Sequence, residues 1–397
     1  MVTRPALLGH SPIFEKKVPI AKPVLPEFEE LTEGLSEILQ SGILSKGPYR
    51  SEFEEKIAEH LGVKHALAVS SCTAGLMLTY QALGLTGDVV VPSFTFMATV
   101  SALRWAGLRP IFADVDASTT NLDPSAAEAA LTHGAQAIVA VHNFGNPSDI
   151  EELELIAQKY QVRLIFDSAH AFGSLYKGRA VGPQGDAHVF SLSPTKLLVA
   201  GEGGIVATND DDIAESVRIG REFGNCGDYD SVVPGINARM PEFNALLGRH
   251  GLRHLESSAL HRNYIADFYR ARLGNLPGIG FQKVRDGNRS SYKDFSVMID
   301  AEAFGLTRDE LDAALTAENI ETRKYYDPPV HRQRAYQRFA PPELQLPNTD
   351  LLASSVLSLP IWSHMDVSVA SGVCLAIEKA HEFADAVREQ VNEEAVV

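Results

Sequence analysis

One lysine is distinguished by the residues around it. Lys196 lies in the stretch FSLSPTKLLVAGEGG, residues 190–204, between small hydroxyl residues and a glycine-rich turn. This is uncommon on a solvated helix face, whereas reactive amines are often presented among small residues with the backbone close by. Read alone, the pattern also fits an ordinary surface lysine before a turn, so the rest of the chain has to decide.

Three other stretches carry groups that would complement such an amine. The segment SSCTAG, residues 70–75, has the small residues that let N–H groups at a helix N-terminus face a phosphate. Asp167 ends an apolar run, and a buried carboxylate requires a cation or several donors. His170 follows one turn later, and Phe96 in PSFTFMAT would cover the face of a flat ring. Each of these features also has an ordinary structural interpretation. Residues 70–75 could simply cap a helix, Asp167 could cap a turn, His170 could be a structural histidine, and Phe96 could belong to the core.

Considered together, these residues indicate pyridoxal phosphate. This cofactor needs an amine for its imine, an acid against its pyridine nitrogen, a phosphate cup and a partner for its ring face. Lys196 would supply the amine, and it would also move the substrate proton if the site lowers its pKa. The Walker-type motif G-x-x-x-x-G-K-[ST] is absent from the sequence, which argues against a nucleoside triphosphate.

The elements that would position these groups form an alternating pattern. Short apolar runs recur between helix-period segments, which predicts a mostly parallel seven-stranded sheet covered by helices on both faces. The predicted strands are His65–Val69, Val89–Val91, Ile111–Ala113, Ala137–His142, Arg163–Asp167, His188–Leu192 and Ile205–Thr208. Ligands bind beyond the carboxyl ends of such strands, and residues 70–75, Asp167 and Lys196 all follow strand ends.

The predicted organisation has three parts. Residues 1–25, with four prolines and no periodicity, are expected to form an irregular arm, residues 26–255 a large cofactor-binding domain, and residues 256–397 a small α+β domain. Helices are predicted over Glu27–Ser41, Leu252–Leu273 and from Asp366 to about Val391, and capping boxes at Ser51, Ser148 and Thr307. A strand with alternating Phe295, Val297 and Ile299 belongs to the small domain.

The composition narrows the classes of function. The 397 residues are 45% hydrophobic and carry a net charge of −16, which argues against nucleic acid or an anionic membrane surface as a partner. Three cysteines without C-x-x-C spacing argue against a zinc or iron–sulfur site and fit a reducing compartment. With no long apolar run and no signal-peptide core, the sequence predicts a soluble cytoplasmic protein.

The motifs resemble those of a known family. In order along the chain they are PIAKPVLP, SGILSKGPYRSEFE, VKHALAVSSCTAGL, VVVPSFTFMATVSAL, AVHNFGNPSDIEEL, FDSAHAFGS, SLSPTKLLVAGEGG, PGINARMPEFNALLG and ETRKYYDPPVH. Together they are similar, over about residues 18–380, to the DegT/DnrJ/EryC1/StrS aminotransferases, which act on nucleotide sugars. This resemblance implies the α/β fold of aspartate aminotransferase, fold type I, and a homodimer with shared active sites.

The resemblance also assigns roles by position. It implies Lys196 as the cofactor-bearing lysine, Asp167 as the partner of the pyridine nitrogen, and His170, where the family often has Gln, near the ring hydroxyl. The remaining implied contacts are the phosphate cup at Thr73 and Ala74, the phosphate-binding Ser191, the stacking Phe96, and Asn237 reaching the phosphate of the neighbouring subunit. Substrate contacts are expected from the loop residues Arg323, Lys324, Tyr326, His331 and Arg332, although a solvated loop is the alternative there.

The expected reaction is transamination. The amino group would pass from L-glutamate to a keto-sugar carried by a nucleoside diphosphate, and a 3- or 4-keto-deoxysugar is the expected substrate. Members of the family that became dehydratases have histidine in place of the lysine, whereas Lys196 is intact here. Position 193 is Ser where the family frequently has His, and this departure leaves the substrate subgroup open.

Two alternatives remain at this stage. One keeps the chemistry but uses a free keto-cyclitol or keto-sugar, with glutamine as a possible donor. The other is a non-catalytic regulatory or ligand-binding protein on the same fold.

Overall fold

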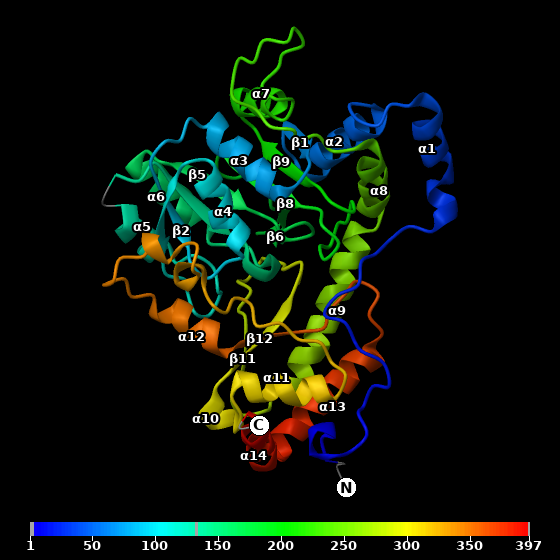
Figure 1. The fold of residues 1–397 in the computed structure, drawn as a ribbon, viewed down its shortest axis with the longest axis vertical. Helices are drawn as coiled ribbons and strands as arrows, with labels where there is room; N and C mark the ends of the chain where they lie inside the picture. The colour runs from blue at the N-terminus through cyan, green and yellow to red at the C-terminus, as the bar shows by residue number, and fades with distance from the viewer. Residues whose placement is uncertain (1–3, 132–133, 396–397) are drawn as a thin grey trace.

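Two β-sheets at opposite ends of the molecule organise the chain. The structure, a computed structural model, describes residues 4–131 and 134–395. A seven-stranded sheet occupies the upper part of the view in Figure 1, and a three-stranded sheet lies below it. The first and last described segments of the chain lie at the lower end of this view, the end that holds the small sheet and its helices. In the described residues, no helix has the length and apolar character needed to cross a bilayer.

The large sheet has the strand order β1-β9-β8-β5-β4-β2-β3. Its strands are β1 (His65–Val69), β2 (Asp88–Pro92), β3 (Arg109–Ala113), β4 (Ala137–Val141), β5 (Arg163–Asp167), β8 (Ala187–Ser191) and β9 (Gly204–Thr208). Strand β9 runs antiparallel to both of its neighbours, and the other strands share one direction. The prediction of a mostly parallel seven-stranded sheet is therefore confirmed, with each predicted strand correct to within two residues at its ends.

Helices cover both faces of this sheet because alternate side chains of each strand point to opposite faces. On one face lie α3 (Cys72–Ala82), α4 (Met97–Trp105) and α7 (Asp211–Gly220), which share one apolar cluster with Val69, Val91 and Val189. On the other face lie α2 (Pro48–Leu61), α5 (Pro124–Ala130), α6 (Ile150–Tyr160) and α8 (Glu242–Arg253). The sheet is thus buried on both sides, which explains why its strands are continuous apolar runs.

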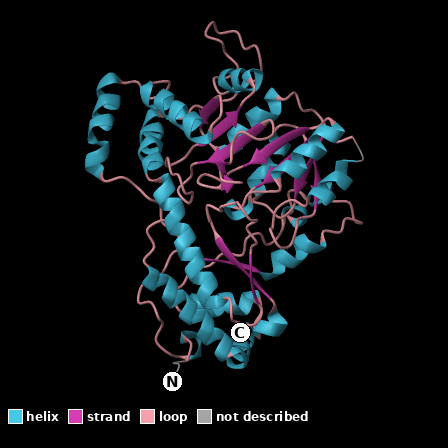
Figure 2. Ribbon diagram, turned by 180° about the vertical axis from the view of Figure 1, so that it is seen from behind, coloured by secondary structure: helices cyan, strands magenta, loops and turns pink. Residues whose placement is uncertain are grey.

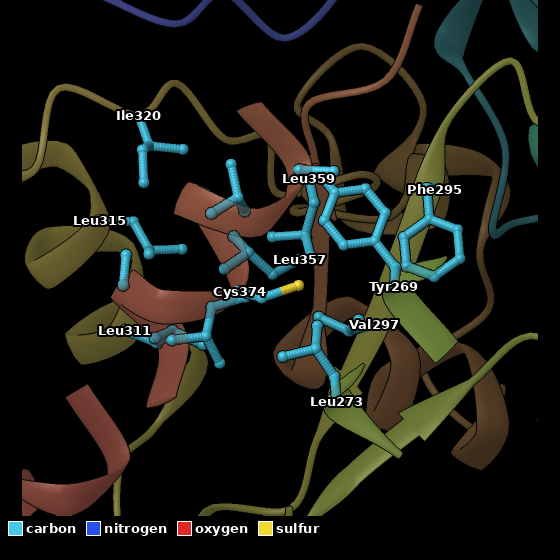
Figure 3. Packing of buried hydrophobic residues seen from close by; sticks show 14 of the residues in the cluster. Tyr269, Leu273, Phe295, Val297, Leu311, Leu315, Ile320, Leu357, Leu359 and Cys374 are labelled. Atoms are coloured by element: carbon cyan, nitrogen blue, oxygen red, sulfur yellow. The ribbon is translucent and has the colours of Figure 1, made fainter. Parts of the chain in front are cut away.

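The small sheet has the order β10-β11-β12 and is antiparallel, with β10 (Ile279–Phe281), β11 (Phe295–Ile299) and β12 (Val356–Leu359). It packs with α9 (Leu255–Leu273), α11 (Arg308–Ala317) and α13 (Val367–Glu382). Figure 3 shows this core, in which Tyr269 of α9 faces Phe295 and the Cys374 thiol lies among aliphatic side chains. The rings of Tyr269 and Phe295 are stacked with centroids 5.0 Å apart.

Helix α9 connects the two ends of the molecule, as Figure 2 shows from behind. The remaining elements are α1 (Phe28–Ser41), α10 (Ala301–Phe304), α12 (Pro347–Ser355), α14 (Ala384–Ala395), the hairpin of β6 (Leu175–Tyr176) and β7 (Arg179–Ala180), and short 3-10 turns η1 (Ala6–Leu8), η3 (Asn143–Gly145), η4 (Val330–Arg332) and η5 (Gln337–Phe339). The predicted domain boundaries near residues 25 and 255 remain predictions.

The N-terminal arm is irregular apart from η1, and it is attached to the end of the molecule that contains the small sheet. The backbone N–H groups of Ala6 and Ile13 donate to the Glu318 carboxylate at 2.9 and 2.7 Å. Val18 forms a parallel bridge with Ile320 and belongs to the apolar cluster of the small sheet. The arm therefore contributes to the core despite its lack of regular structure.

Two of the predicted helices are each divided in two. The Leu252–Leu273 prediction spans the end of α8 and all of α9, with a break at His254, and the Asp366–Val391 prediction spans α13 and α14, with a break at Phe383. The Glu27–Ser41 prediction is confirmed as α1, which ends at Gly42 in the left-handed region at φ 68°.

One of the three predicted capping boxes forms. Thr307 and Glu310 cap α11 reciprocally. The prediction for Ser51 is wrong because α2 already begins at Pro48, which is suited to the first turn of a helix, and Ser51 lies inside it. The prediction for Ser148 is also wrong: its hydroxyl donates to the carbonyl of Val141 at 2.9 Å instead of capping α6.

Candidate active site

Seven of the predicted site residues line one cavity beyond the carboxyl ends of the central strands: Thr73, Phe96, Asp167, His170, Ser191, Lys196 and Tyr326. Its volume is about 220 Å³. It is lined by Ser71, Cys72, Thr73, Thr95, Phe96, Ala98, Thr99, Val141, Asp167, Ala169, His170, Ser191, Ser193, Lys196, Glu202 and Tyr326. Strands β1, β4, β5 and β8 run in the same direction, so the segments that follow them meet at one edge of the sheet.

Lys196 lies in the loop between β8 and β9. Its backbone N–H donates to the carbonyl of Ser193 at 3.0 Å, which closes a turn. The next four residues, 197–200, are buried and anchor the loop, while the lysine itself is half-buried. Burial lowers the pKa of Lys196 to about 8, and the nearby Lys293 ammonium acts in the same direction. A much larger fraction of this amine is therefore uncharged near neutral pH than of an ordinary lysine, although the ammonium still predominates. This favours its use as a nucleophile or a base.

Asp167 ends β5 and is 4% exposed. One carboxylate oxygen, Oδ2, accepts a hydrogen bond from Thr99 Oγ1 at 2.7 Å, and Oδ1 accepts from the N–H of Ala169 at 3.1 Å. Burial nevertheless raises the pKa of Asp167. A cation placed in the cavity would stabilise the charged carboxylate, and a protonated pyridine nitrogen is such a cation.

His170 presents one defined nitrogen to the cavity. Its Nδ1 accepts a hydrogen bond from the backbone N–H of Phe144 at 3.2 Å, so the proton of the neutral ring is on Nε2. Burial lowers the pKa of His170 well below its usual range, and the charge of Lys196 acts in the same direction. The imidazole is thus a neutral donor that lines the cavity with its Nε2–H available.

The N-terminus of α3 forms another wall. Thr73 lines the cavity, whereas the backbone N–H of its neighbour Ala74 donates to Ser71 Oγ at 3.1 Å as the helix cap. Strand β9 passes very close to this turn at Gly204, where an added Cβ would lie 2.6 Å from the backbone N of Cys72 and the carbonyl carbon of Ser71. Gly204 is therefore required for the approach of β9 to the helix start.

Phe96 and Tyr326 stand at the boundary of a second cavity of about 410 Å³. Phe96 is 49% exposed, and Tyr326 is buried against Phe94 and Phe144. Arg323 and Lys324 line the second cavity only.

The loop residues form two groups in this chain. Tyr326 borders both cavities, and Arg323 and Lys324 face the second one, where Lys324 is paired with Asp309 and Asp312 at 2.7 and 3.0 Å. His331 and Arg332 line neither cavity. His331 Nδ1 is 2.6 Å from Ser93 Oγ, and Arg332 is paired with Asp350 at 2.5 Å. The Ser93 contact fastens the loop to the end of β2, and the Asp350 ion pair joins it to α12.

Asn237 is exposed, forms an isolated bridge with Glu222, and does not line the cavity of its own chain. This position agrees with the expectation that it serves a neighbouring subunit, and that role stays a prediction.

The sequence analysis missed several cavity-lining groups. Thr99 bonds Asp167, and Thr95 Oγ1 lies 2.9 Å from Thr99 Oγ1. The Cys72 thiol is directed at the carbonyl of Val189, 3.4 Å from its sulfur. Thr95 and Thr99 lie on either side of Phe96 and are four residues apart, about one helical turn. This spacing in the sequence could have suggested that both lie near the cavity. Within residues 4–131 and 134–395, no group of three or more side chains suitable for a metal ion occurs.

Fold and cavity together define the class of protein. The solved structure of DesI in the presence of its TDP-sugar product superimposes with a TM-score of 0.91 at 36% identity, covering 100% of both chains. A DegT DnrJ EryC1 StrS aminotransferase from Brucella abortus gives a TM-score of 0.83 at 30% identity, covering 89% of this chain and 95% of that one. The chain thus has the fold of the sugar aminotransferases.

The chain belongs to the DegT/DnrJ/EryC1/StrS aminotransferase family, whose sequence profile matches residues 27–378. It is 35% identical over 384 residues to the spore coat polysaccharide biosynthesis protein SpsC of Bacillus subtilis (strain 168), covering 93% of this chain and 98% of that protein. It is 34% identical to the dTDP-4-amino-4,6-dideoxy-D-glucose transaminase of Escherichia coli, covering 89% and 96%. The resemblance seen in the motifs is confirmed, and the protein is an enzyme of the transaminase type.

Proposed function

We propose that this enzyme binds pyridoxal phosphate through Lys196 and transfers an amino group from L-glutamate to a nucleoside-diphosphate-linked keto-deoxysugar. The observation that carries the proposal is the convergence of Lys196, Asp167, His170 and Phe96, from three separate segments, on one cavity. The named relatives, among them the dTDP-amino-sugar transaminase of Escherichia coli, support the substrate class.

The cavity fits the cofactor in the chemistry of its lining. Asp167 is a buried carboxylate that would be stabilised by a cationic ring nitrogen, and the Nε2–H of His170 would donate to a ring oxygen. Thr73 and Ser191 place hydroxyls by the start of α3, where the helix dipole favours a phosphate. Phe96 would cover one face of the ring. When bound, pyridoxal phosphate supplies the electron sink for the carbon that loses or gains a proton.

Three residues that line the cavity would have separate roles in the reaction. Lys196 Nζ would hold the cofactor, and it is also the group placed to accept and return a substrate proton because its pKa of about 8 is close to working pH. Asp167 would keep the ring nitrogen of a bound cofactor protonated. Tyr326 stays a neutral phenol, since burial raises its pKa well above the usual range, and it orients groups between the two cavities by hydrogen bonding.

The second cavity would receive the sugar nucleotide. It opens beside Phe96, and Arg323 and Lys324 line it together with Asp312 and Asp327. A diphosphate bound there would have to draw Lys324 away from its ion pairs with Asp309 and Asp312. His331 and Arg332 support this loop from outside the cavities, so their proposed contact with the substrate would require the loop to rearrange.

Completing the site would take a second copy of the chain. Asn237 is exposed on its own subunit and would reach the cofactor phosphate of the neighbour, which makes the homodimer part of the proposal. We also propose that the enzyme works in the cytoplasm.

A reduction experiment tests the cofactor. Borohydride treatment of cofactor-saturated protein followed by peptide mapping should locate a pyridoxyl group on Lys196. An adduct found only on other lysines, or on none, would refute the proposal. The protein should also absorb near 420 nm, as expected for an imine of this cofactor, and lose that band on addition of L-glutamate.

A substrate panel tests the second half of the proposal. Nucleotide-linked 3- and 4-keto-deoxysugars should be aminated with far higher kcat/KM than the free keto-sugars and keto-cyclitols, with mass spectrometry of the products as the measurement. Preference for a free ketone or for glutamine would favour the aminoglycoside-type alternative. A colourless protein unaffected by glutamate would favour a regulatory role.

A further inference from the structure

One buried phenylalanine has a backbone conformation that phenylalanine rarely adopts. Phe144, in the 3-10 turn η3, has φ 59° and ψ 10°, in the left-handed region. This region costs free energy for a residue with a Cβ, whereas glycine occupies it readily, as Gly145 does at φ 91°. Strain of this kind is concentrated at functional sites, where the surrounding contacts maintain it.

The backbone of Phe144 contacts His170. Its N–H donates to Nδ1 of His170 at 3.2 Å, which places the proton of the neutral imidazole on Nε2. His170 lines the smaller cavity. The hydrogen bond from Phe144 therefore decides which nitrogen of His170 can donate to a molecule bound there.

The side chain of Phe144 contacts a second cavity-lining residue. Its ring is fully buried and stacks on the ring of Tyr326, with centroids 5.8 Å apart and planes 14° apart. The ring of Phe94 stands edge-on to both, with its centroid 6.3 Å from that of Phe144 and 5.3 Å from that of Tyr326. Aromatic pairs in these geometries stabilise beyond the area they bury. Tyr326 lines both cavities, so the stack fixes a ring at their boundary.

The turn that carries Phe144 is held by a distant segment of the chain. The backbone N–H of Lys293 donates to the carbonyl of Phe144 at 3.0 Å, and that of Ser291 donates to the carbonyl of Gly145 at 3.3 Å. Ser291 Oγ donates to the carbonyl of His170 at 2.6 Å, and a Cβ at Gly145 would lie 2.0 Å from the Ser291 oxygen. The strained turn and the backbone of His170 are thus fixed by the same neighbours.

We propose that Phe144 is a positioning residue that fixes two cavity-lining side chains at once. Its N–H fixes the imidazole of His170 with the proton on Nε2, and its ring fixes the ring of Tyr326. Phe144 itself lines neither cavity, so it acts only through these two residues. The proposal rests on the proposed function in one respect: the cofactor is taken to occupy the smaller cavity, where His170 would donate to a ring oxygen.

Two replacements separate the backbone of Phe144 from its ring. Phe144→Leu keeps the N–H and removes the aromatic ring. Phenyllactic acid, the α-hydroxy analogue of phenylalanine, keeps the ring when it is incorporated in place of Phe144 and replaces the N–H by an ester oxygen. The proposal requires Phe144→Leu to disturb Tyr326 and to leave the tautomer of His170 unchanged, and it requires the ester variant to do the reverse.

NMR of the full chain freed of cofactor measures both effects. Isotope-labelled histidine shows which nitrogen of His170 carries the proton, and His170→Gln assigns the signal. We expect the Nε2–H tautomer in the wild-type protein and in Phe144→Leu, and a shift toward the Nδ1–H tautomer in the ester variant. Fluorine-labelled tyrosine shows the order of the Tyr326 ring, and Tyr326→Phe assigns its line. This line should broaden or divide in Phe144→Leu only.

The enzyme loaded with pyridoxal phosphate should show the same division. Phe144→Leu should raise KM for the nucleotide-linked ketone by about 2- to 10-fold, the effect expected of one aromatic pair, with a smaller change in kcat. The ester variant should instead bind the cofactor more weakly and keep a KM close to that of the wild-type protein, because part of its His170 population offers no donor to the ring oxygen.

A matched control separates positioning from destabilisation. Phe295→Leu removes another buried ring, which stacks on Tyr269 at 5.0 Å in the core of the small sheet and lines neither cavity. It should lower stability and leave both NMR signals unchanged. An unchanged tautomer of His170 in the ester variant, or an unchanged Tyr326 line in Phe144→Leu, would overturn the proposal.

The two proposals can fail separately. Neither NMR signal needs the cofactor, so both remain valid if borohydride reduction finds no adduct on Lys196. If Phe144→Leu does not fold, the ester variant decides alone, because the proposal requires the tautomer of His170 to change when the N–H is removed.

Discussion

At the scale of single residues, the proposed function depends most on Lys196. We expect Lys196→Ala to lower kcat by at least about 10³-fold, because both the covalent attachment and the proton transfer at its Nζ are lost. The variant should bind the cofactor without the 420 nm band of the wild-type protein. Turnover close to wild type in a homogeneous preparation would contradict the assignment, and Lys177→Ala, a change at an exposed lysine paired with Glu151, is the matched control.

Thr99 is the residue through which Asp167 is held. Thr99→Val keeps the shape but leaves Oδ2 of a buried carboxylate without its 2.7 Å hydrogen bond, which should cost about 1–3 kcal/mol of unfolding free energy and weaken cofactor binding. Urea denaturation and a cofactor titration measure the two effects. Thr79→Val removes a buried hydroxyl that donates to Gly75 within α3, and it should leave cofactor affinity unchanged. Equal cofactor affinity in both variants would show that Thr99 does not position Asp167.

The residues at the centre of the candidate site could be predicted from the sequence. The residues that hold them in position through hydrogen bonds could not. Lys196, Asp167 and Phe96 follow strand ends, and that position alone placed them at one edge of a parallel sheet. Ser291, whose hydroxyl donates to the carbonyl of His170, lies 121 residues further along the chain in a segment with no catalytic motif. Only the packing of the second part of the chain onto the first brings it to the cavity wall.

At the scale of elements, the start of α3 depends on one glycine. Gly204→Ala would place a methyl group 2.6 Å from the backbone of Ser71 and Cys72, so the helix start has to move. We expect a loss of about 1–3 kcal/mol in stability and a clearly weaker affinity for the cofactor phosphate. Gly87→Ala, whose nearest contact is the flexible Gln136 at 3.3 Å, is the control. Wild-type phosphate affinity in Gly204→Ala would show that the α3 start is not the phosphate site.

Element types followed from local pattern more reliably than element ends. The apolar runs identified all seven strands because strands buried on both faces are made mainly of apolar residues, with few exceptions such as His188 and Asp167. The break at Phe383 has no glycine or proline beside it, and the break at His254 is preceded only by Gly251 in the last turn of α8, so neither was predicted from the sequence. The wrong prediction of a capping box at Ser51 is also an error in a helix end, because the helix begins about one turn earlier, at Pro48.

At the scale of the whole molecule, buried imidazoles make stability depend on acid. His142 and His188 are fully buried with parallel rings 5.6 Å apart, and burial lowers the pKa of His142 to about 3 and that of His188 well below its usual range. Below about pH 6.5 the unfolded chain binds protons that the folded chain does not. Stability should therefore fall with decreasing pH, by about 1.4 kcal/mol per pH unit for each such group.

Chemical denaturation between pH 7 and pH 5 measures this dependence. His142→Gln, which keeps an acceptor for the N–H of Ser148, should reduce the slope by the share of one group. A slope that is flat in the wild-type protein, or equal in the two proteins, would contradict the assignment of the acid sensitivity to buried histidines.

The attachment of the N-terminal arm has a consequence for how the gene is cloned. The family profile begins at residue 27, and an expression design guided by it would discard everything earlier. Such a truncation would strip two N–H partners from Glu318, which is 1% exposed, and uncover the apolar surface beneath Val18. We expect the shortened product to precipitate or be degraded by host proteases, although every residue lining the catalytic cavity would still be encoded.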